Sequence, residues 1–164
     1  MLPNPIRERL VSAIQKSPHP RELVVDVLYA LQRHYGYLSD QAVLEAAELL
    51  DMSVIEIEEL ATFYDYIYRE PVGKYVIHAC DSIVCWMQGY ESVMQYLSTK
   101  LGIPVGGTTA DGLFSLLPAG CIGYCDHAPA MLINGEPFGP LTPETIDAIL
   151  DRLRREQPVI GEVR

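Results

Sequence analysis

The sequence predicts an α+β chain in which a bundle of short helices precedes a small sheet backed by further helices. Three observations lead to this class. Residues 1–70 contain no cysteine and carry apolar residues at helical spacing. The composition changes at Pro71-Val72-Gly73, and apolar runs typical of strands follow. The later elements follow the order β-α-β-β-α. We therefore expect a helical domain over 1–70, a second domain over 71–155 and a loose tail over 156–164.

Four short helices are expected in the first domain. They start near Asn4, Pro20, Ser39 and Ser53. Asn4 provides an N-cap, and Pro5 suits the first helical turn. Ser53-Val-Ile-Glu56 matches a capping box, in which the serine and the glutamate each satisfy a free backbone amide. Because each helix has one apolar side, we expect the four helices to bury these sides against one another.

The second domain alternates between strand and helix patterns. The expected strands cover 74–78, 113–117 and 130–133, and the expected helices cover 82–101 and a segment that starts at Thr142-Pro143. Asn134-Gly135 is typical of a hairpin turn. A small sheet backed by helices in this order is the thioredoxin-like arrangement.

Charge and hydropathy exclude several classes of function. The 164 residues include 12 Lys and Arg against 22 Asp and Glu, which gives a net charge of −10. Such a surface repels phosphate backbones, so we expect no nucleic-acid binding. No segment has the roughly 18 consecutive apolar residues that span a bilayer, so we expect no membrane insertion.

The start of the chain and its cysteines indicate a compartment. The first five residues, Met1 to Pro5, contain no basic segment that leads into an apolar run, so we expect no signal peptide and a cytoplasmic protein. In that reducing compartment, four cysteines are more often metal ligands or redox groups than structural disulfides.

The four cysteines form two closely spaced pairs, Cys80-x4-Cys85 and Cys121-x3-Cys125. Each pair is expected in a loop where a strand ends. Gly120 and Gly123 near the second pair would let backbone amides approach the sulfur atoms. A 2Fe–2S cluster held by four thiolates carries negative charge, and burying that charge is costly unless amides point at the sulfurs. The pattern therefore favours a 2Fe–2S cluster on these four residues.

Other uses of the thiols are weaker. A structural zinc site also takes four cysteines, and gaps of x4 and x3 lie within its tolerance, so a zinc-stabilised interaction module stays open on spacing alone. A thiol redox enzyme of the thioredoxin type would need C-x-x-C, which the sequence lacks. A Rieske centre would use histidines such as His78 and His127, but four cysteines already complete the ligand shell.

The residues around the cysteines resemble a known family. The similar segments are Ala61-Thr62-Phe63-Tyr64, Pro71-Val72-Gly73, Cys80-Asp81-Ser82-Ile83-Val84-Cys85 and Leu116-Leu117-Pro118-Ala119-Gly120-Cys121-Ile122-Gly123-Tyr124-Cys125-Asp126. Together they resemble the thioredoxin-like 2Fe–2S subunit of the NADH dehydrogenase module of respiratory complex I, known as the E subunit of NADH-quinone oxidoreductase. The similarity extends over almost the whole chain.

The resemblance implies a fold and a function. It implies an N-terminal helical bundle, a thioredoxin-like 2Fe–2S ferredoxin domain, and Cys80, Cys85, Cys121 and Cys125 as the cluster ligands. It implies a one-electron transfer subunit of NADH:quinone oxidoreductase, with no substrate pocket of its own, in the cytoplasmic peripheral arm of a membrane-associated complex. FMN and NADH would bind a partner flavoprotein, and further iron–sulfur subunits would complete the complex. An NAD-linked hydrogenase or a formate dehydrogenase is the alternative host.

Overall fold

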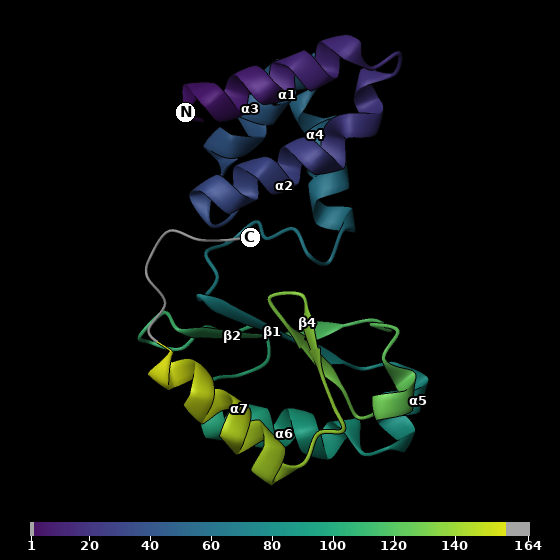
Figure 1. Ribbon diagram of the computed structural model, residues 1–164, viewed down its shortest axis with the longest axis vertical. Coiled ribbons are helices and arrows are strands. Elements are labelled where there is room, and N and C mark those ends of the chain that lie inside the picture. The colour runs from purple at the N-terminus through teal and green to yellow at the C-terminus, as the bar shows by residue number, and fades with distance from the viewer. Residues whose placement is uncertain (1, 157–164) are drawn as a thin grey trace. The chain divides into compact units, whose positions relative to one another are not determined.

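The computed structural model describes residues 2–156. Its elements confirm the expected α+β class, because helices come first and a four-stranded sheet with further helices follows. The chain divides into two compact units, with the boundary between Pro71 and Val72 (Figure 1). Of the expected tail over 156–164, only Glu156 lies within the described residues.

The first unit contains four α-helices. These are α1 (Asn4–Lys16), α2 (Val24–Tyr35), α3 (Asp40–Leu50) and α4 (Val54–Phe63), with a short 3-10 turn, Pro20–Leu23, before α2. Apolar side chains from all four helices meet in one core. Leu28, Leu31 and Ile57 are fully buried there. The helices thus bury their apolar sides against one another, as their sequence spacing indicates.

The start of α4 agrees with the prediction from the sequence, whereas the start of α1 differs from it. Ser53 and Glu56 form the expected capping box, with the Glu56 side chain accepting from the Ser53 backbone amide at 3.0 Å. The expected Asn4 N-cap is wrong. Pro3 takes the capping position and Asn4 is already helical, because the fixed φ of Pro3 lets the helix start directly after it.

Because of this capping box, we expect the stability of the chain to depend on pH. Hydrogen bonds from Ser53, with help from Arg21, lower the pKa of Glu56 from 4.5 to about 2. The stabilisation of the folded chain by the Glu56 carboxylate is therefore complete above about pH 4.5 and is lost as the pH falls towards 2. We expect Glu56→Gln to reduce the loss of unfolding free energy between about pH 5 and about pH 3, measured by urea denaturation of the full chain. The matched control, Glu59→Gln on the same helix, should keep the wild-type slope. A Glu56→Gln slope equal to the wild-type slope would contradict this account.

Two side chains hold the backbone that follows α4. The Gln32 amide donates to the Tyr66 carbonyl at 2.8 Å, and its oxygen accepts from the Tyr68 amide at 2.7 Å. The Arg69 guanidinium pairs with Glu58 at 2.6 Å, and it also donates to the carbonyl of Leu38. The Gln32 bonds satisfy backbone groups of a segment that has no helix or strand ladder of its own, and the Arg69 bonds tie that segment to α4 and to the residue before Ser39.

The second unit is built on a four-stranded sheet. Its strands are β1 (Tyr75–Cys80), β2 (Phe114–Ala119), β3 (Met131–Ile133) and β4 (Glu136–Phe138), in the order β2-β1-β3-β4. β1 and β2 are parallel, whereas the β1–β3 and β3–β4 pairs are antiparallel. The expected strands are present, and β4 is an additional short strand beyond the Asn134-Gly135 turn.

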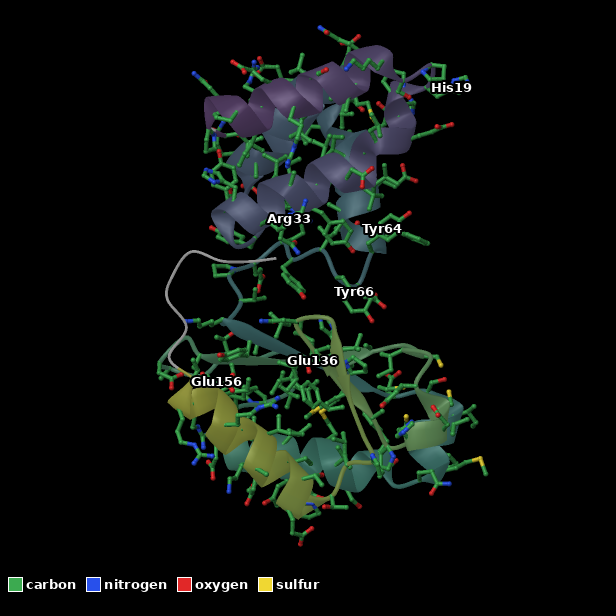
Figure 2. The ribbon with its side chains drawn as sticks, viewed as in Figure 1. His19, Arg33, Tyr64, Tyr66, Glu136 and Glu156 are labelled. Carbon is green, nitrogen blue, oxygen red and sulfur yellow. The ribbon has the colours of Figure 1, made fainter. Side chains whose placement is uncertain are left out.

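Three helices accompany the sheet. They are α5 (Ile83–Met87), α6 (Tyr90–Leu101) and α7 (Pro143–Arg155). α6 and α7 cover one face of the sheet (Figure 1), and their apolar residues share a core with Ile77 and Phe114. Glu156, labelled at the end of α7 in Figure 2, accepts a hydrogen bond from the Tyr75 hydroxyl through its carbonyl oxygen. Within residues 2–156, no helix is both long enough and apolar enough to cross a bilayer.

The expectation of one helix over 82–101 is wrong. Gly89 lies between α5 and α6 with a left-handed φ of 95°. Such a conformation interrupts an α-helix and is readily adopted by glycine. As a result, α5 is a separate five-residue helix.

Candidate metal centre

The sheet topology brings the two cysteine pairs to the same edge. Because β1 and β2 are parallel, their carboxyl ends lie side by side, with Cys80 in register with Ala119. The Asp81 amide donates to the Ala119 carbonyl at 2.9 Å, so the two chain segments stay paired one residue beyond β1. Cys121 follows two residues after Ala119, and it therefore emerges beside Cys80.

The four cysteines lie on different kinds of backbone. Cys80 is the last residue of β1, and Cys85 lies in the middle of α5. Cys121 lies in the loop after β2, and Cys125 starts a short 3-10 helix, Cys125–His127. The expectation of a loop is thus wrong for Cys80 and Cys85, because the strand extends to the first of them and a helical turn holds the second.

The thiols are grouped in two pairs. The sulfur atoms of Cys121 and Cys125 are 3.6 Å apart. Cys85 and Cys80 are joined by a side-chain hydrogen bond. The pairs also interact with each other, since ionised Cys125 raises the pKa of Cys85 and ionised Cys80 raises the pKa of Cys125. The structure therefore places the two pairs within electrostatic reach of each other.

The four thiols are not arranged as a site for a single metal ion. Among the side chains of residues 2–156, no group of three or more His, Cys, Asp or Glu is gathered closely enough to hold a single metal ion.

The pair from the first segment is buried. Cys80 and Cys85 are each 1% exposed. Burial raises the pKa of Cys85 to about 11, and the hydrogen bond with Cys80 acts in the same direction. The backbone amide of Ala130 donates to the Cys85 thiol and opposes this rise. An electropositive group at this site would replace the thiol proton, because metal binding requires the thiolate.

Cys121 and Cys125 are exposed, and Cys121 accepts hydrogen bonds from neighbouring groups. The backbone amide of Gly123 donates to Cys121 and lowers the pKa of that thiol. Gly123 has a φ of +77°, which its lack of a side chain permits, and this turn points its amide back at Cys121. The hydroxyl of Ser82 also donates to Cys121, so the loop between Cys80 and Cys85 contributes a hydrogen-bond donor to the other cysteine pair.

Aromatic stacking orders the backbone around Cys125. The rings of Tyr124 and His127, on either side of Cys125 in the sequence, stack with centroids 4.3 Å apart and planes 7° apart. The Asp126 carboxylate lies 3.0 Å from His127 Nδ1, and this contact lowers the pKa of Asp126. Cys125 is therefore held in a compact turn although its side chain is exposed.

The loop between β4 and α7 supports this turn. A side-chain carbon added at Gly139 would overlap the carbonyl oxygen of His127 and approach its carbonyl carbon to 3.2 Å. Just beyond, the Leu141 amide donates to the Pro129 carbonyl at 2.9 Å. Sequence reasoning missed Gly139, because its contact with His127 is visible only in three dimensions.

The residues present suit an iron–sulfur group. Four thiols form two pairs, and in a 2Fe–2S cluster each iron takes two protein ligands. Three donors, the amides of Gly123 and Ala130 and the hydroxyl of Ser82, point at the sulfur atoms. Such donors compensate the negative charge that four thiolates and a cluster bring into a partly buried site.

Comparison with known families agrees with this chemistry. The family model for thioredoxin-like [2Fe-2S] ferredoxins matches residues 10–154. The chain belongs to the thioredoxin-like [2Fe-2S] ferredoxin family. This confirms the thioredoxin-like 2Fe–2S domain expected from the sequence, and the match also takes in most of the helical unit.

Similar proteins carry more specific names. This thioredoxin-like ferredoxin is 39% identical to the E subunit of NADH-quinone oxidoreductase from Pseudomonas aeruginosa over 144 residues, which cover 85% of this chain and 87% of that protein. It is 38% identical to the E subunit from Escherichia coli over 148 residues, or 90% of this chain and 89% of that one. The resemblance to the E subunit of NADH-quinone oxidoreductase is thus confirmed.

A solved structure with a similar fold belongs to another assembly. The ferredoxin superposes on a chain of an NAD+-reducing [NiFe]-hydrogenase in its air-oxidized state with a TM-score of 0.69 and 31% identity. The matched region is 80% of this chain but only 23% of the hydrogenase chain. This ferredoxin therefore spans about a quarter of that longer polypeptide.

Proposed function

We propose that this chain is the electron-transferring 2Fe–2S subunit of an NADH:quinone oxidoreductase, with Cys80, Cys85, Cys121 and Cys125 as the four cluster ligands. The observation that carries the proposal is the convergence of these thiols at one sheet edge in a chain of the ferredoxin family. The names of the relatives, which are E subunits of NADH-quinone oxidoreductase, support the host complex.

The roles of this chain's own residues follow from their surroundings. Cys80 and Cys85 would anchor one side of the cluster in the protein interior, since both are buried. Cys121 and Cys125 would hold the other side at the surface, where both are exposed. The Gly123 amide and the Ser82 hydroxyl would stabilise the negative charge on Cys121.

The partner that supplies electrons would bind FMN and NADH and oxidise the NADH. A flavin accepts the hydride of NADH and can release electrons one at a time, and a 2Fe–2S cluster takes up a single electron. We propose that FMN and NADH bind a separate flavoprotein, and that this chain contributes ligands and surface but no substrate pocket. We place the chain among further iron–sulfur subunits in the cytoplasmic peripheral arm of the complex.

A second host is favoured by a specific observation. The fold superposes on an NAD+-reducing [NiFe]-hydrogenase chain at 31% identity. In such a host the cysteines would have the same roles, but electrons would flow towards NAD+, as the name of that enzyme states, and not away from NADH.

The proposal is tested by electron delivery from NADH. The chain, prepared anaerobically, is mixed with the FMN-binding protein of the same organism, and NADH is added. We expect bleaching of the visible absorption of this chain and a paramagnetic signal, at a rate that depends on the flavoprotein. Omitting the flavoprotein is the control, and it should leave the chain oxidised. No reduction in the complete mixture, with a cluster present, would contradict the proposed electron partner.

A further inference from the structure

The two cysteine pairs differ in their access to solvent. Cys80 and Cys85 are each 1% exposed, whereas Cys121 and Cys125 are both exposed. All four are free thiols. A dissolved reagent can therefore reach the second pair from the surface, while the surrounding protein shields the first. We call Cys121 and Cys125 the surface pair, and Cys80 and Cys85 the buried pair.

The turn that carries the surface pair holds its two sulfur atoms close to each other. They are 3.6 Å apart, and a disulfide needs about 2.05 Å between its sulfurs. The left-handed φ of Gly123 turns the chain back on itself between the two cysteines. The stacked rings of Tyr124 and His127 order the same turn. The gap that remains, about 1.5 Å, is of a size that rotation of two exposed side chains can close.

We propose that the surface pair is a redox switch for cluster insertion. While the chain holds no cluster, Cys121 and Cys125 form a disulfide by exchange with glutathione disulfide, and this bond blocks loading until a thiol reduces it. The inference rests on the proposed function, because it takes these residues as ligands, and it adds a regulation of that site. Metal binding requires thiolates, which a disulfide does not provide. An oxidised surface pair would leave only the buried pair as ligands.

Two successive thiol–disulfide exchanges form the bond. The thiolate of one cysteine of the surface pair attacks a sulfur of glutathione disulfide, whose S–S bond breaks and releases one glutathione thiolate. The thiolate of the other cysteine then attacks the protein sulfur of the mixed disulfide and displaces the second glutathione. The two cysteines together lose two electrons and two protons, and these convert glutathione disulfide into two glutathione molecules. Exposed disulfides are the labile ones, so excess reducing thiol reverses the reaction.

Burial keeps the other pair out of this reaction. Exchange passes through a mixed disulfide, so the attacking cysteine must have room for an attached glutathione. Cys80 and Cys85 offer no such room, since each is 1% exposed. The buried pair therefore keeps its thiols, and the switch acts on one side of the site only.

Peptide mapping of the full chain tests the inference, because trypsin separates the two pairs. Cleavage after Lys74, Lys100 and Arg152 leaves the buried pair in peptide 75–100 and the surface pair in peptide 101–152. The iron-free full chain is incubated with glutathione disulfide, alkylated and digested. We expect peptide 101–152 to lack alkylation and to be lighter than its reduced form by two hydrogen atoms, and peptide 75–100 to be alkylated at both cysteines. A disulfide within 75–100, a bond between the two peptides, or free thiols in 101–152 would overturn the inference.

Single variants show whether the two surface cysteines react with each other. Cys121→Ser and Cys125→Ser each remove one member of the surface pair, so the exchange should stop with one glutathione attached to the remaining surface cysteine. The wild type, treated in the same way, should carry no glutathione. A stable glutathione adduct on the wild type would overturn the inference.

Cluster loading gives the second readout. The donor is a scaffold protein that carries a 2Fe–2S cluster, with no free sulfide or thiol added, because either would reduce the disulfide. The oxidised full chain should take up about tenfold less iron than the reduced chain, and treatment with dithiothreitol should restore the uptake. Equal uptake by the oxidised and reduced chains would overturn the inference. A reduced chain that takes up no iron would instead refute the proposed function.

Discussion

Replacement of Cys85 by alanine is expected to abolish binding of the iron–sulfur cluster. Cys85 is 1% exposed, lies next to Cys80 and accepts a hydrogen bond from the Ala130 amide. Removing this thiol would leave one iron with an incomplete set of ligands at the buried side of the site. Iron and acid-labile sulfide of the anaerobically purified chain should fall from about two each per chain to near zero, with loss of visible absorption.

A neighbouring substitution controls for general damage to α5. Gln88→Ala changes an exposed residue just after the helix and should retain iron at the wild-type level. If Cys85→Ala bound as much iron and sulfide as Gln88→Ala, Cys85 would not be a ligand.

The second large effect is expected at Gly139, which supports the turn around Cys125. In Gly139→Ala the added methyl group would overlap the carbonyl oxygen of His127, a backbone atom that moves only with its whole turn. Such overpacking costs about 1–3 kcal/mol of unfolding free energy. We expect lower stability in urea denaturation and faster loss of iron to a chelator, because the displaced turn carries Cys125.

Gly120→Ala is the matched control for this variant. Gly120 directly precedes Cys121, yet an added side-chain carbon would meet nothing within 4 Å. It should therefore change neither stability nor iron release appreciably. Equal behaviour of the two alanine variants would mean that the contact between Gly139 and His127 does not support the centre.

The sequence predicts the elements well where local chemistry decides them. The Ser53–Glu56 capping box and the helices with one apolar side depend on residues close together in the chain. The Asn4 cap fails because Pro3 also fits the capping position. The break at Gly89 is missed because the apolar residues on both sides keep helical spacing, although a glycine with left-handed φ separates two helices.

The candidate site also contains residues that the sequence indicates and residues that it does not. Cysteine spacing and flanking glycines indicate the four thiols, and the Gly123 amide indeed points at Cys121. The support from Gly139 depends on a contact between two separate loops and has no local signal. The exposure of α5 is likewise hidden in the sequence, because Val84 and Met87 have the spacing of buried helix residues and only the fold shows that they stay exposed.

Metal analysis of the anaerobically prepared full chain tests most directly whether four thiolates at one edge of the sheet hold a single 2Fe–2S cluster. We predict about two irons and two acid-labile sulfides per chain, visible absorption when oxidised, and a paramagnetic signal after reduction by one electron. A colourless chain with stoichiometric zinc, or with no metal at all, would contradict it.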